Sequence, residues 1–337
     1  MIVLAAADKF KGTASAAQVC AAIGHACWEL GLDCIERPMA DGGEGTLDVL
    51  GGPNRVTTVT GPLGDPVDAE WRLHKGIAVI EIARASGLTL IGGADKNDAI
   101  AASTQGTGEL IDTALDAGAK KIIVCLGGSA TTDGGLGAVR AIHAPARLKA
   151  VEFLVACDVD TLFVDAAEVF APQKGATPAQ VDLLRKRLER LQQMYERDYG
   201  VDVSTLIGAG AAGGLAGGLA ALGATLVNGF DLVAEEVGFY DVIKTVDFVI
   251  TGEGFVDEQS FDGKVVGSVC DLAQDADVSV ATICGDVDGA LPNDVRTLAN
   301  AHSLTALFGE HEAMSRPLQL IAEVATTILR GAIAAAE

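Results

Sequence analysis

The sequence predicts an α/β protein with two domains, in which a flavodoxin-like domain with a parallel sheet is interrupted by an inserted second α/β domain. Short apolar strands followed by glycine-rich turns and helices recur along the chain. The first two and the last three of these strands precede loops with acids or glycines, as at the ligand-binding edge of open parallel sheets. The length of 337 residues also suits about two domains.

The flavodoxin-like domain is expected to combine residues 1–55 and 241–337. Its five strands are predicted at 2–6, 34–39, 248–251, 280–284 and 304–308, where short apolar runs end in turn or acidic residues. The inserted domain is expected to span residues 56–240, with strands at 78–82, 121–126 and 153–156 and a helix over 103–117. A second helix is predicted from the N-cap Thr177 to a stop at Gly200, because Gln180 closes a capping box with Thr177 and Pro178 stands at the first helical position.

Composition excludes several classes of function. The net charge of −22 argues against nucleic acid and anionic lipid partners, which recruit basic clusters. The seven cysteines form no CxxC pair and the five histidines no HExxH motif, so a reduced, cytoplasmic protein without a zinc site is expected. Residues 208–227 carry no charge, but their many glycines and missing Lys or Arg anchors favour a buried helix over a membrane span.

The loop DKFKGTAS at 8–15 places an aspartate and two lysines before a predicted helix. A helix N-terminus beside Lys9 and Lys11 can bind an anion, although a capped strand-to-helix turn often has the same composition. In the loop ADGGEGT at 40–46, glycines allow Asp41 and Glu44 to approach one Mg²⁺ ion, and a turn with solvated acids remains an equal alternative.

The loop LGGSATTDGGLG at 126–137 follows an apolar strand. Its small residues expose consecutive N–H groups and hydroxyls, and these predict a phosphate cradle; the residues concerned are Gly127, Gly128, Ser129, Ala130 and Thr131. Asp133 stands where a base or a metal ligand could lie. No GKS or GKT follows, so the loop is not a Walker A motif.

The loop TGEGFVDEQSFDGK at 251–264 combines glycines, four carboxylates and a lysine. The backbone at Gly252 and Gly254 is a candidate for binding phosphate, and Lys264 for neutralising a transferring phosphoryl group. The candidate metal ligands in this loop are Glu253, Asp257 and Glu258.

A competing pattern is GxGxxG at Gly208, Gly210 and Gly213, with Asp231 about twenty residues further on, as in a dinucleotide fingerprint. The preceding segment 201–207 is short and interrupted by polar residues, and further glycines follow the pattern. These features favour tight helix packing over a nucleotide site.

Taken together, the loops resemble the type 1 glycerate kinase family. The resemblance rests on motifs that follow one another in the family's order over nearly the whole chain: DKFKG at 8–12, ADGGEGT at 40–46, GGSATTDGG at 127–135, CDV at 157–159, PQKGATP at 172–178, GAAGGLAGGL at 210–219 and TGEGFVDEQSFDGK at 251–264.

The resemblance implies ATP- and Mg²⁺-dependent phosphorylation of D-glycerate to 2-phosphoglycerate, in a cleft between the two domains. Asp8 or Asp133 could be the base for the acceptor hydroxyl, and both remain candidates. Lys9 and Lys11 are candidates for binding the glycerate carboxylate, with Lys11 also acting in catalysis, and Asp158 of the CDV motif is expected to bind substrate. The sequence leaves open whether the protein is a monomer or a homodimer.

Two departures from the family pattern concern substrate choice. The segment 136–156 is shorter than the family's, and the loop 160–171 lacks the usual Asn-Pro-Leu turn. Glycerate 3-kinase activity or a related small hydroxy acid substrate is therefore the first alternative. An NAD-dependent hydroxy-acid dehydrogenase and a non-catalytic nucleotide or phosphate sensor are two further alternatives.

Overall fold

The computed structural model describes residues 1–291 and 300–336 and contains two compact units. The first unit comprises Met1–Asp41 and Phe230–Glu337, and the second comprises Gly42–Gly229. The chain therefore passes from one unit to the other within the loop ADGGEGT, whereas the sequence suggested a passage near residue 55. The return lies at Gly229 and Phe230, before the expected residue 240.

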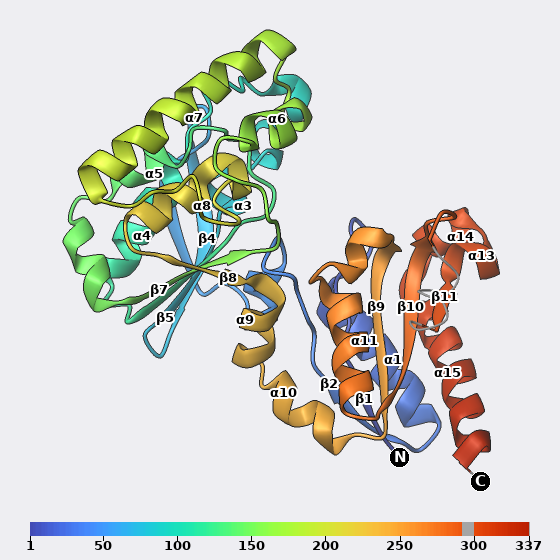
Figure 1. The fold of residues 1–337 in the computed structure, drawn as a ribbon. Helices are drawn as coiled ribbons and strands as arrows, with labels where there is room; N and C mark the ends of the chain where they lie inside the picture. The colour runs from blue at the N-terminus through green and yellow to red at the C-terminus, as the bar shows by residue number, and fades with distance from the viewer. Residues whose placement is uncertain (292–299, 337) are drawn as a thin grey trace. The chain divides into compact units, whose positions relative to one another are not determined.

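The first unit contains a five-stranded parallel sheet in the order β11-β10-β9-β1-β2 (Figure 1). In chain order this is the 2-1-3-4-5 arrangement of flavodoxin-like sheets, which confirms the predicted fold. The strands are β1 (Ile2–Ala5), β2 (Asp33–Glu36), β9 (Phe248–Val256), β10 (Ser279–Val287) and β11 (Ala301–Ser303).

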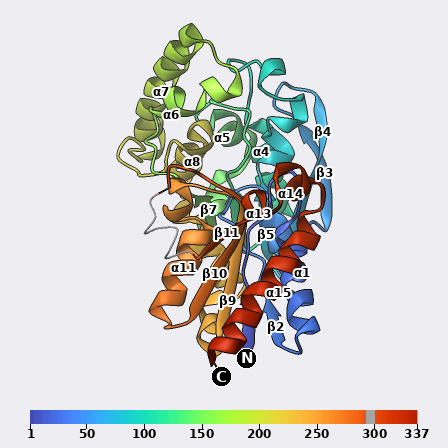
Figure 2. The same ribbon diagram turned by 90° about the vertical axis from the view of Figure 1, so that its right-hand side faces the viewer.

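Helices cover both faces of this sheet. The helices α1 (Ala16–Glu29) and α15 (Pro317–Ala336) pack against each other on one face, and α11 (Val265–Asp275) covers the other (Figure 2). The helix α1 begins at Ser15, whose side chain forms a capping box with Gln18. The loop between β1 and α1 is thus held at the carboxyl edge of the sheet.

The predicted strand at 304–308 is wrong. These residues form the short helix α13 (Leu304–Phe308), and the fifth strand lies just before them. The hydroxyl of Ser303 accepts a hydrogen bond from the backbone N–H of Ala306, which starts the helix at that position. The apolar run was short enough to suit either structure.

The second unit contains a six-stranded sheet in the order β3-β4-β5-β6-β7-β8. Three strands at one edge are antiparallel, and the remaining neighbours are parallel (Figure 1). The strands are β3 (Arg55–Thr60), β4 (Pro66–His74), β5 (Ile77–Glu81), β6 (Lys121–Cys125), β7 (Glu152–Cys157) and β8 (Thr225–Asn228).

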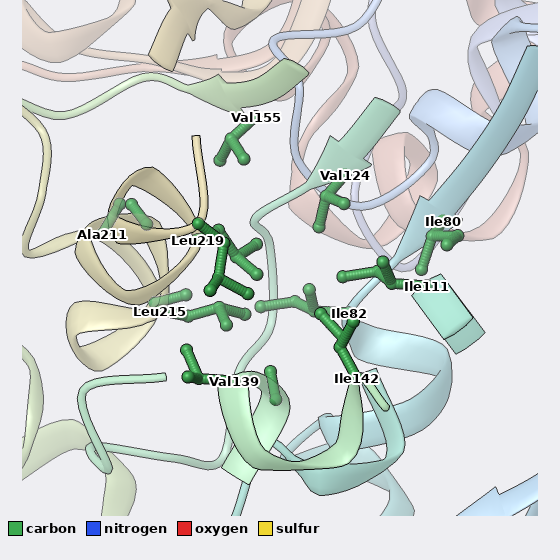
Figure 3. Packing of buried hydrophobic residues seen from close by; sticks show 14 of the residues in the cluster. Ile80, Ile82, Ile111, Val124, Val139, Ile142, Val155, Ala211, Leu215 and Leu219 are labelled. Carbon is green, nitrogen blue, oxygen red and sulfur yellow. The ribbon is translucent and has the colours of Figure 1, made fainter. Parts of the chain in front are cut away.

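The core of the second unit lies between this sheet and the helices α4 (Gln105–Asp116), α5 (Leu136–Ala141) and α8 (Ala211–Ala221). Figure 3 shows side chains of strands and helices meeting there, including Ile80, Val124 and Leu215. The helix α8 is buried along its whole length, as expected for the uncharged segment 208–227. The turn at its start is left-handed at Ala212, Gly213 and Gly214, and a Cβ on Gly213 would lie 2.0 Å from the carbonyl oxygen of Thr131.

The predicted helix at 177–200 is confirmed as α7 (Pro178–Tyr199), with its capping box at Thr177 and a left-handed Gly200. The remaining α-helices among the described residues are short: α2 (Thr46–Val49), α3 (Ala83–Ser86), α6 (Ala166–Phe170), α9 (Gly229–Glu236), α10 (Phe239–Val242) and α14 (Glu310–Ser315). The 3-10 turns that bear on function are η4 (Pro172–Lys174) and η6 (Glu258–Phe261).

In the described part of the chain, one helix, α15, is long and apolar enough to cross a membrane. Its buried residues Leu320, Ile321 and Val324 belong to the core of the first unit. The exposed Gln319 and Glu323 lie on its other face. This amphipathic pattern is typical of a helix that packs on one side against its own protein.

Candidate active site

The carboxyl edge of the first unit's sheet brings together residues from separate loops. Asp8 follows β1, Asp41 follows β2, Glu253 lies within β9, and Asp257 follows β9. Because these strands are parallel, their carboxyl ends lie at the same edge. Three of the sequence loops that carry the predicted acids therefore meet within this unit.

Asp8 is buried at this edge. Its backbone N–H donates to the carbonyl oxygen of Gly252 at 2.8 Å, so the segment after β1 continues along β9. Burial raises the pKa of the Asp8 carboxyl to about 6; the neighbouring Lys9 opposes this shift, and the charge of Asp41 adds to it. The Nζ atom of Lys9 lies 3.6 Å from the Asp8 carboxylate.

Glu253 has the second perturbed carboxyl of this edge. Burial raises its pKa to about 7, a hydrogen bond from Ser260 and the charge of Lys264 lower it, and the charges of Asp8 and Asp257 raise it. Its Oε1 atom is buried without a hydrogen-bond partner among the described residues. A buried carboxylate oxygen with no partner is costly, and a cation could satisfy it.

Asp257 and Lys264 flank the turn η6. The Asp257 carboxylate accepts a hydrogen bond from the backbone N–H of Ser260 at 3.1 Å and forms a capping box with that residue. Lys264 is the N-cap residue of α11, and its charge acts on Glu253. The charges of both Asp257 and Lys264 therefore act on the Glu253 carboxyl.

Close backbone packing positions the loop that carries Lys9 and Lys11. A Cβ on Gly254 would lie 3.1 Å from the backbone nitrogen of Lys11, so this glycine lets β9 approach the loop. A Cβ on Gly252 would lie 2.0 Å from the carbonyl oxygen of Ile283. The Lys11 side chain is exposed at this edge. Both glycines therefore have a packing role that does not depend on phosphate.

Within the described ranges, no group of three or more His, Cys, Asp or Glu side chains is arranged to hold a metal ion by itself. A hydrated Mg²⁺ needs only one or two protein carboxylates when substrate phosphates supply other ligands. The carboxylates of the first unit are oxygen donors of the type that Mg²⁺ prefers, and Glu253 Oε1 has an unused lone pair. The residues present therefore fit a phosphate-bridged Mg²⁺ ion.

The other predicted site residues lie in the second unit. Glu44 belongs to this unit, unlike Asp41. Gly128 is left-handed, and a Cβ there would lie 1.8 Å from Oε1 of Glu44, so the Glu44 carboxylate lies directly over the glycines of the predicted phosphate cradle. Asp158 lies just after β7. This strand pairs with β6, and the predicted phosphate cradle follows β6 in the chain.

Glu81 at the end of β5 is a residue that the sequence reasoning missed. It is 2% exposed, and its Oε1 atom accepts hydrogen bonds from the backbone N–H groups of Gly45 and Leu47, each at 2.8 Å. Its Oε2 atom pairs with Arg84 at 3.3 Å. Glu81 thus holds the loop that carries Glu44. The sequence signal was an acid that ends an apolar strand.

Asp133 is enclosed by donors from its surroundings. Its carboxylate accepts hydrogen bonds from the backbone N–H and hydroxyl of Thr104 and from the backbone N–H groups of Gly135 and Gly137. Burial raises the pKa of this carboxyl, and these hydrogen bonds oppose the shift. Both carboxylate oxygens are therefore used to hold the starts of α4 and α5 against the 126–137 loop.

Ser129 contacts Lys174, which belongs to the motif PQKGATP. The Nζ atom of Lys174 lies 2.7 Å from Ser129 Oγ and 2.6 Å from the carbonyl oxygen of Thr131. Burial lowers the pKa of Lys174 to about 7, and the charge of Asp133 opposes this shift. A residue that would be exposed in most turns is here inside the second unit.

The GxGxxG pattern does not have the structure of a dinucleotide fingerprint. Turns precede Gly208 where a strand is required. Cβ atoms on Gly208 and Gly210 would lie 2.8 Å from Cys157 Sγ and 2.4 Å from the carbonyl oxygen of Leu162, respectively. Asp231 accepts a hydrogen bond from the hydroxyl of Tyr240. These glycines therefore allow close packing.

Comparison with known proteins decides the family. The model of the Glycerate kinase family matches residues 3–145 and 143–332. The chain belongs to the glycerate kinase family. A "Glycerate kinase" of Halalkalibacterium halodurans is 39% identical over 325 residues, with 85% of each chain covered. The Escherichia coli K12 "Glycerate 2-kinase" is 36% identical, with 91% of this chain and 90% of that protein covered.

A solved structure agrees with this assignment. The crystal structure of a Salmonella typhimurium LT2 protein assigned as glycerate kinase 2 superposes with a TM-score of 0.82 at 34% identity, covering 98% of this chain and 99% of that one. Membership of the glycerate kinase family confirms the resemblance seen in the sequence motifs and makes the chain an enzyme of the phosphotransferase class. The two segments matched by the family model meet at residues 143–145, within the segment expected to be shortened.

Proposed function

We propose that this enzyme transfers the γ-phosphoryl group of MgATP to D-glycerate and releases 2-phospho-D-glycerate. The observation that carries the proposal is the pair of buried carboxyls, Asp8 and Glu253, with lysines nearby at the carboxyl edge of the first unit's sheet, in a chain of the glycerate kinase family. Phosphoryl transfer asks mainly for positioning and charge stabilisation, which such a group supplies.

Asp8 is the base that this geometry favours over Asp133. A base must reach the acceptor hydroxyl and bind its proton near the operating pH, and burial brings the pKa of Asp8 to about 6. The Asp133 carboxylate is already occupied by donors of its own unit. Asp8 would take the proton of the glycerate hydroxyl as the new oxygen–phosphorus bond forms.

The lysines divide between the two anionic substrates. Lys9 and Lys11 would bind the glycerate carboxylate as point charges, with Lys11 also countering charge during transfer, and Asp158 would bind a glycerate hydroxyl. Lys264 would neutralise the transferring phosphoryl group. Backbone N–H groups would hold phosphate oxygens, from residues Gly127, Gly128, Ser129, Thr131, Gly252 and Gly254. The N–H group of Ala130, also expected to bind phosphate, donates instead to the carbonyl oxygen of Ser86 at 2.9 Å.

The candidate metal ligands are Asp41, Glu44, Glu253 and Asp257. When bound, Mg²⁺ supplies the positive charge that an acidic protein needs near a triphosphate. The protein residues would fix the position of the cation through one or two carboxylates and leave its other ligands to phosphate and water. We further propose that the protein acts in the cytoplasm and needs no nucleic acid or membrane partner, in keeping with its acidic surface.

The experiment is an ADP-release assay with purified protein, MgATP and D-glycerate. Glycerate-dependent ADP formation supports the kinase, and its absence contradicts it. The same assay with other small hydroxy acids tests the first alternative, because the altered loop 160–171 bears on substrate choice. Nicotinamide absorbance changes without ATP would favour the dehydrogenase, and ATP binding without turnover would favour a sensor.

A further inference from the structure

The Lys174 side chain is buried in the second unit, and its Nζ atom donates two hydrogen bonds there. It is 4% exposed and donates to Ser129 Oγ at 2.7 Å and to the carbonyl oxygen of Thr131 at 2.6 Å. Its Nζ atom also lies 5.9 Å from the centre of the Phe170 ring. The two hydrogen bonds and the nearby ring offset part of the cost of burying an ammonium group.

The turn that carries Lys174 is fixed to the predicted phosphate loop. The side-chain amide of Asn97 donates to the carbonyl oxygens of both Lys174 and Ala130, at 2.8 and 2.9 Å. The next residue, Gly175, is left-handed, and a Cβ there would lie 2.4 Å from the carbonyl oxygen of Ala94. The position of the Lys174 ammonium against Ser129 is therefore set by the backbone on both sides.

This contact bears on the role of the Ser129 hydroxyl. Lys174 Nζ donates to Ser129 Oγ, and the protonated lysine has no lone pair to accept with, so this oxygen is the acceptor while the lysine is charged. The hydroxyl proton of Ser129 then points away from Lys174 and can serve as a donor. The hydroxyls of Thr131 and Thr132 are buried without a partner within the described residues, so this loop has more donors than its fold uses.

We propose that Lys174 is a positioning residue that holds the Ser129 hydroxyl as a donor to a phosphate oxygen of the bound nucleotide. The inference rests on the proposed phosphoryl transfer and adds a residue to it. Gly127 and Gly128, which are proposed to bind phosphate through their backbone, directly precede Ser129 in the chain. Lys174 acts through Ser129 and does not itself touch the nucleotide.

The test is a double-mutant cycle with Lys174→Met, Ser129→Ala and the double variant, with Lys149→Met as an exposed lysine control. Each single variant should raise the KM for MgATP about 10- to 100-fold, the cost of a hydrogen bond to a charged group, with little change in the KM for glycerate. The double variant should be no worse than the poorer single variant, because both changes remove the same donor.

Three outcomes would overturn the inference: wild-type KM for MgATP in Ser129→Ala, effects that multiply in the double variant, or a change confined to the KM for glycerate. Because Ser129→Ala keeps the buried lysine, its KM for MgATP still tests the inference if Lys174→Met does not fold. If the wild type shows no glycerate turnover, the proposed function fails. The same cycle in MgATP dissociation constants, measured by calorimetry, then still tests the role of Lys174.

Discussion

The carboxylate of Asp133 accepts two hydrogen bonds from Thr104, one from its backbone N–H at 2.9 Å and one from its hydroxyl at 2.8 Å. Asp133→Asn would place an amide N–H₂ among donors, and we expect the free energy of unfolding to fall by about 1–3 kcal/mol. Urea unfolding measures this, with the exposed Asp95→Asn as control. Unchanged stability together with lost turnover would instead make Asp133 the base.

Asp8→Asn removes the proposed base. We expect kcat to fall by about 10² to 10⁴, while the exposed Asp33→Asn in the same unit stays at wild-type activity. In the wild type, kcat/KM should rise with pH until the Asp8 carboxyl is ionised, near its pKa of about 6. An Asp8→Asn variant with normal turnover would remove Asp8 from the mechanism.

Ionisation of the Asp8 carboxyl should raise activity but lower the stability of the fold. The pKa of Asp8 is higher in the folded protein than the ordinary value of 3.8 for an aspartate, so the folded state binds the proton more tightly. Its contribution to the free energy of unfolding is present below pH 3.8 and is lost as pH rises towards about 6. At pH 7, Asp8→Asn should therefore have a thermal midpoint at or above that of the wild type. A lower midpoint would mean that the ionised carboxylate stabilises the fold.

Lys11→Ala should mainly affect glycerate. Loss of one charge-assisted contact to the carboxylate should raise the KM for glycerate by roughly 10- to 100-fold, and the KM for MgATP should change little. The exposed Lys244→Ala in the same unit is the matched control, and steady-state kinetics with each substrate varied in turn gives both constants. Equal effects on both substrates would argue against a carboxylate contact.

Asp257→Asn should raise the Mg²⁺ concentration needed for half-maximal activity. Asparagine is as good an N-cap as aspartate, so the turn η6 should keep its structure while one possible ligand charge is lost. A Mg²⁺ titration at fixed ATP measures the shift, with the exposed Asp271→Asn on α11 as control. A wild-type Mg²⁺ titration of Asp257→Asn would show that Asp257 caps the turn and does not bind the ion.

The sequence predicted strands, helix caps and the acids that follow strands, because each depends on residues close together in the chain. The strand β1, the capping box at Thr177 and the acids that follow β1, β2 and β9 were all readable from apolar runs and turn residues. The strand predicted at 304–308 failed because the Ser303 cap outweighed a short apolar run. The crossing at Asp41 and Gly42 lies inside the motif ADGGEGT, where no change in composition marks it.

The candidate site was harder to predict from the sequence, because the residues that support it are brought together only by the tertiary structure. Lys174 lies two residues after Pro172 and directly before Gly175, as in an exposed turn, and only the fold brings it to Ser129. Asp133 resembled a free catalytic acid until the donors of Thr104, Gly135 and Gly137 were in place. Buried partners from distant segments cannot be inferred from one loop at a time.

The most direct measurement is the identity of the product formed from D-glycerate and MgATP. We predict that enolase alone converts it to phosphoenolpyruvate, at a rate that matches ADP release, because the hydroxyl phosphorylated is at carbon 2. A product that enolase converts only after a phosphoglycerate mutase is added would contradict the 2-kinase assignment. ADP release that does not depend on D-glycerate would contradict the whole account.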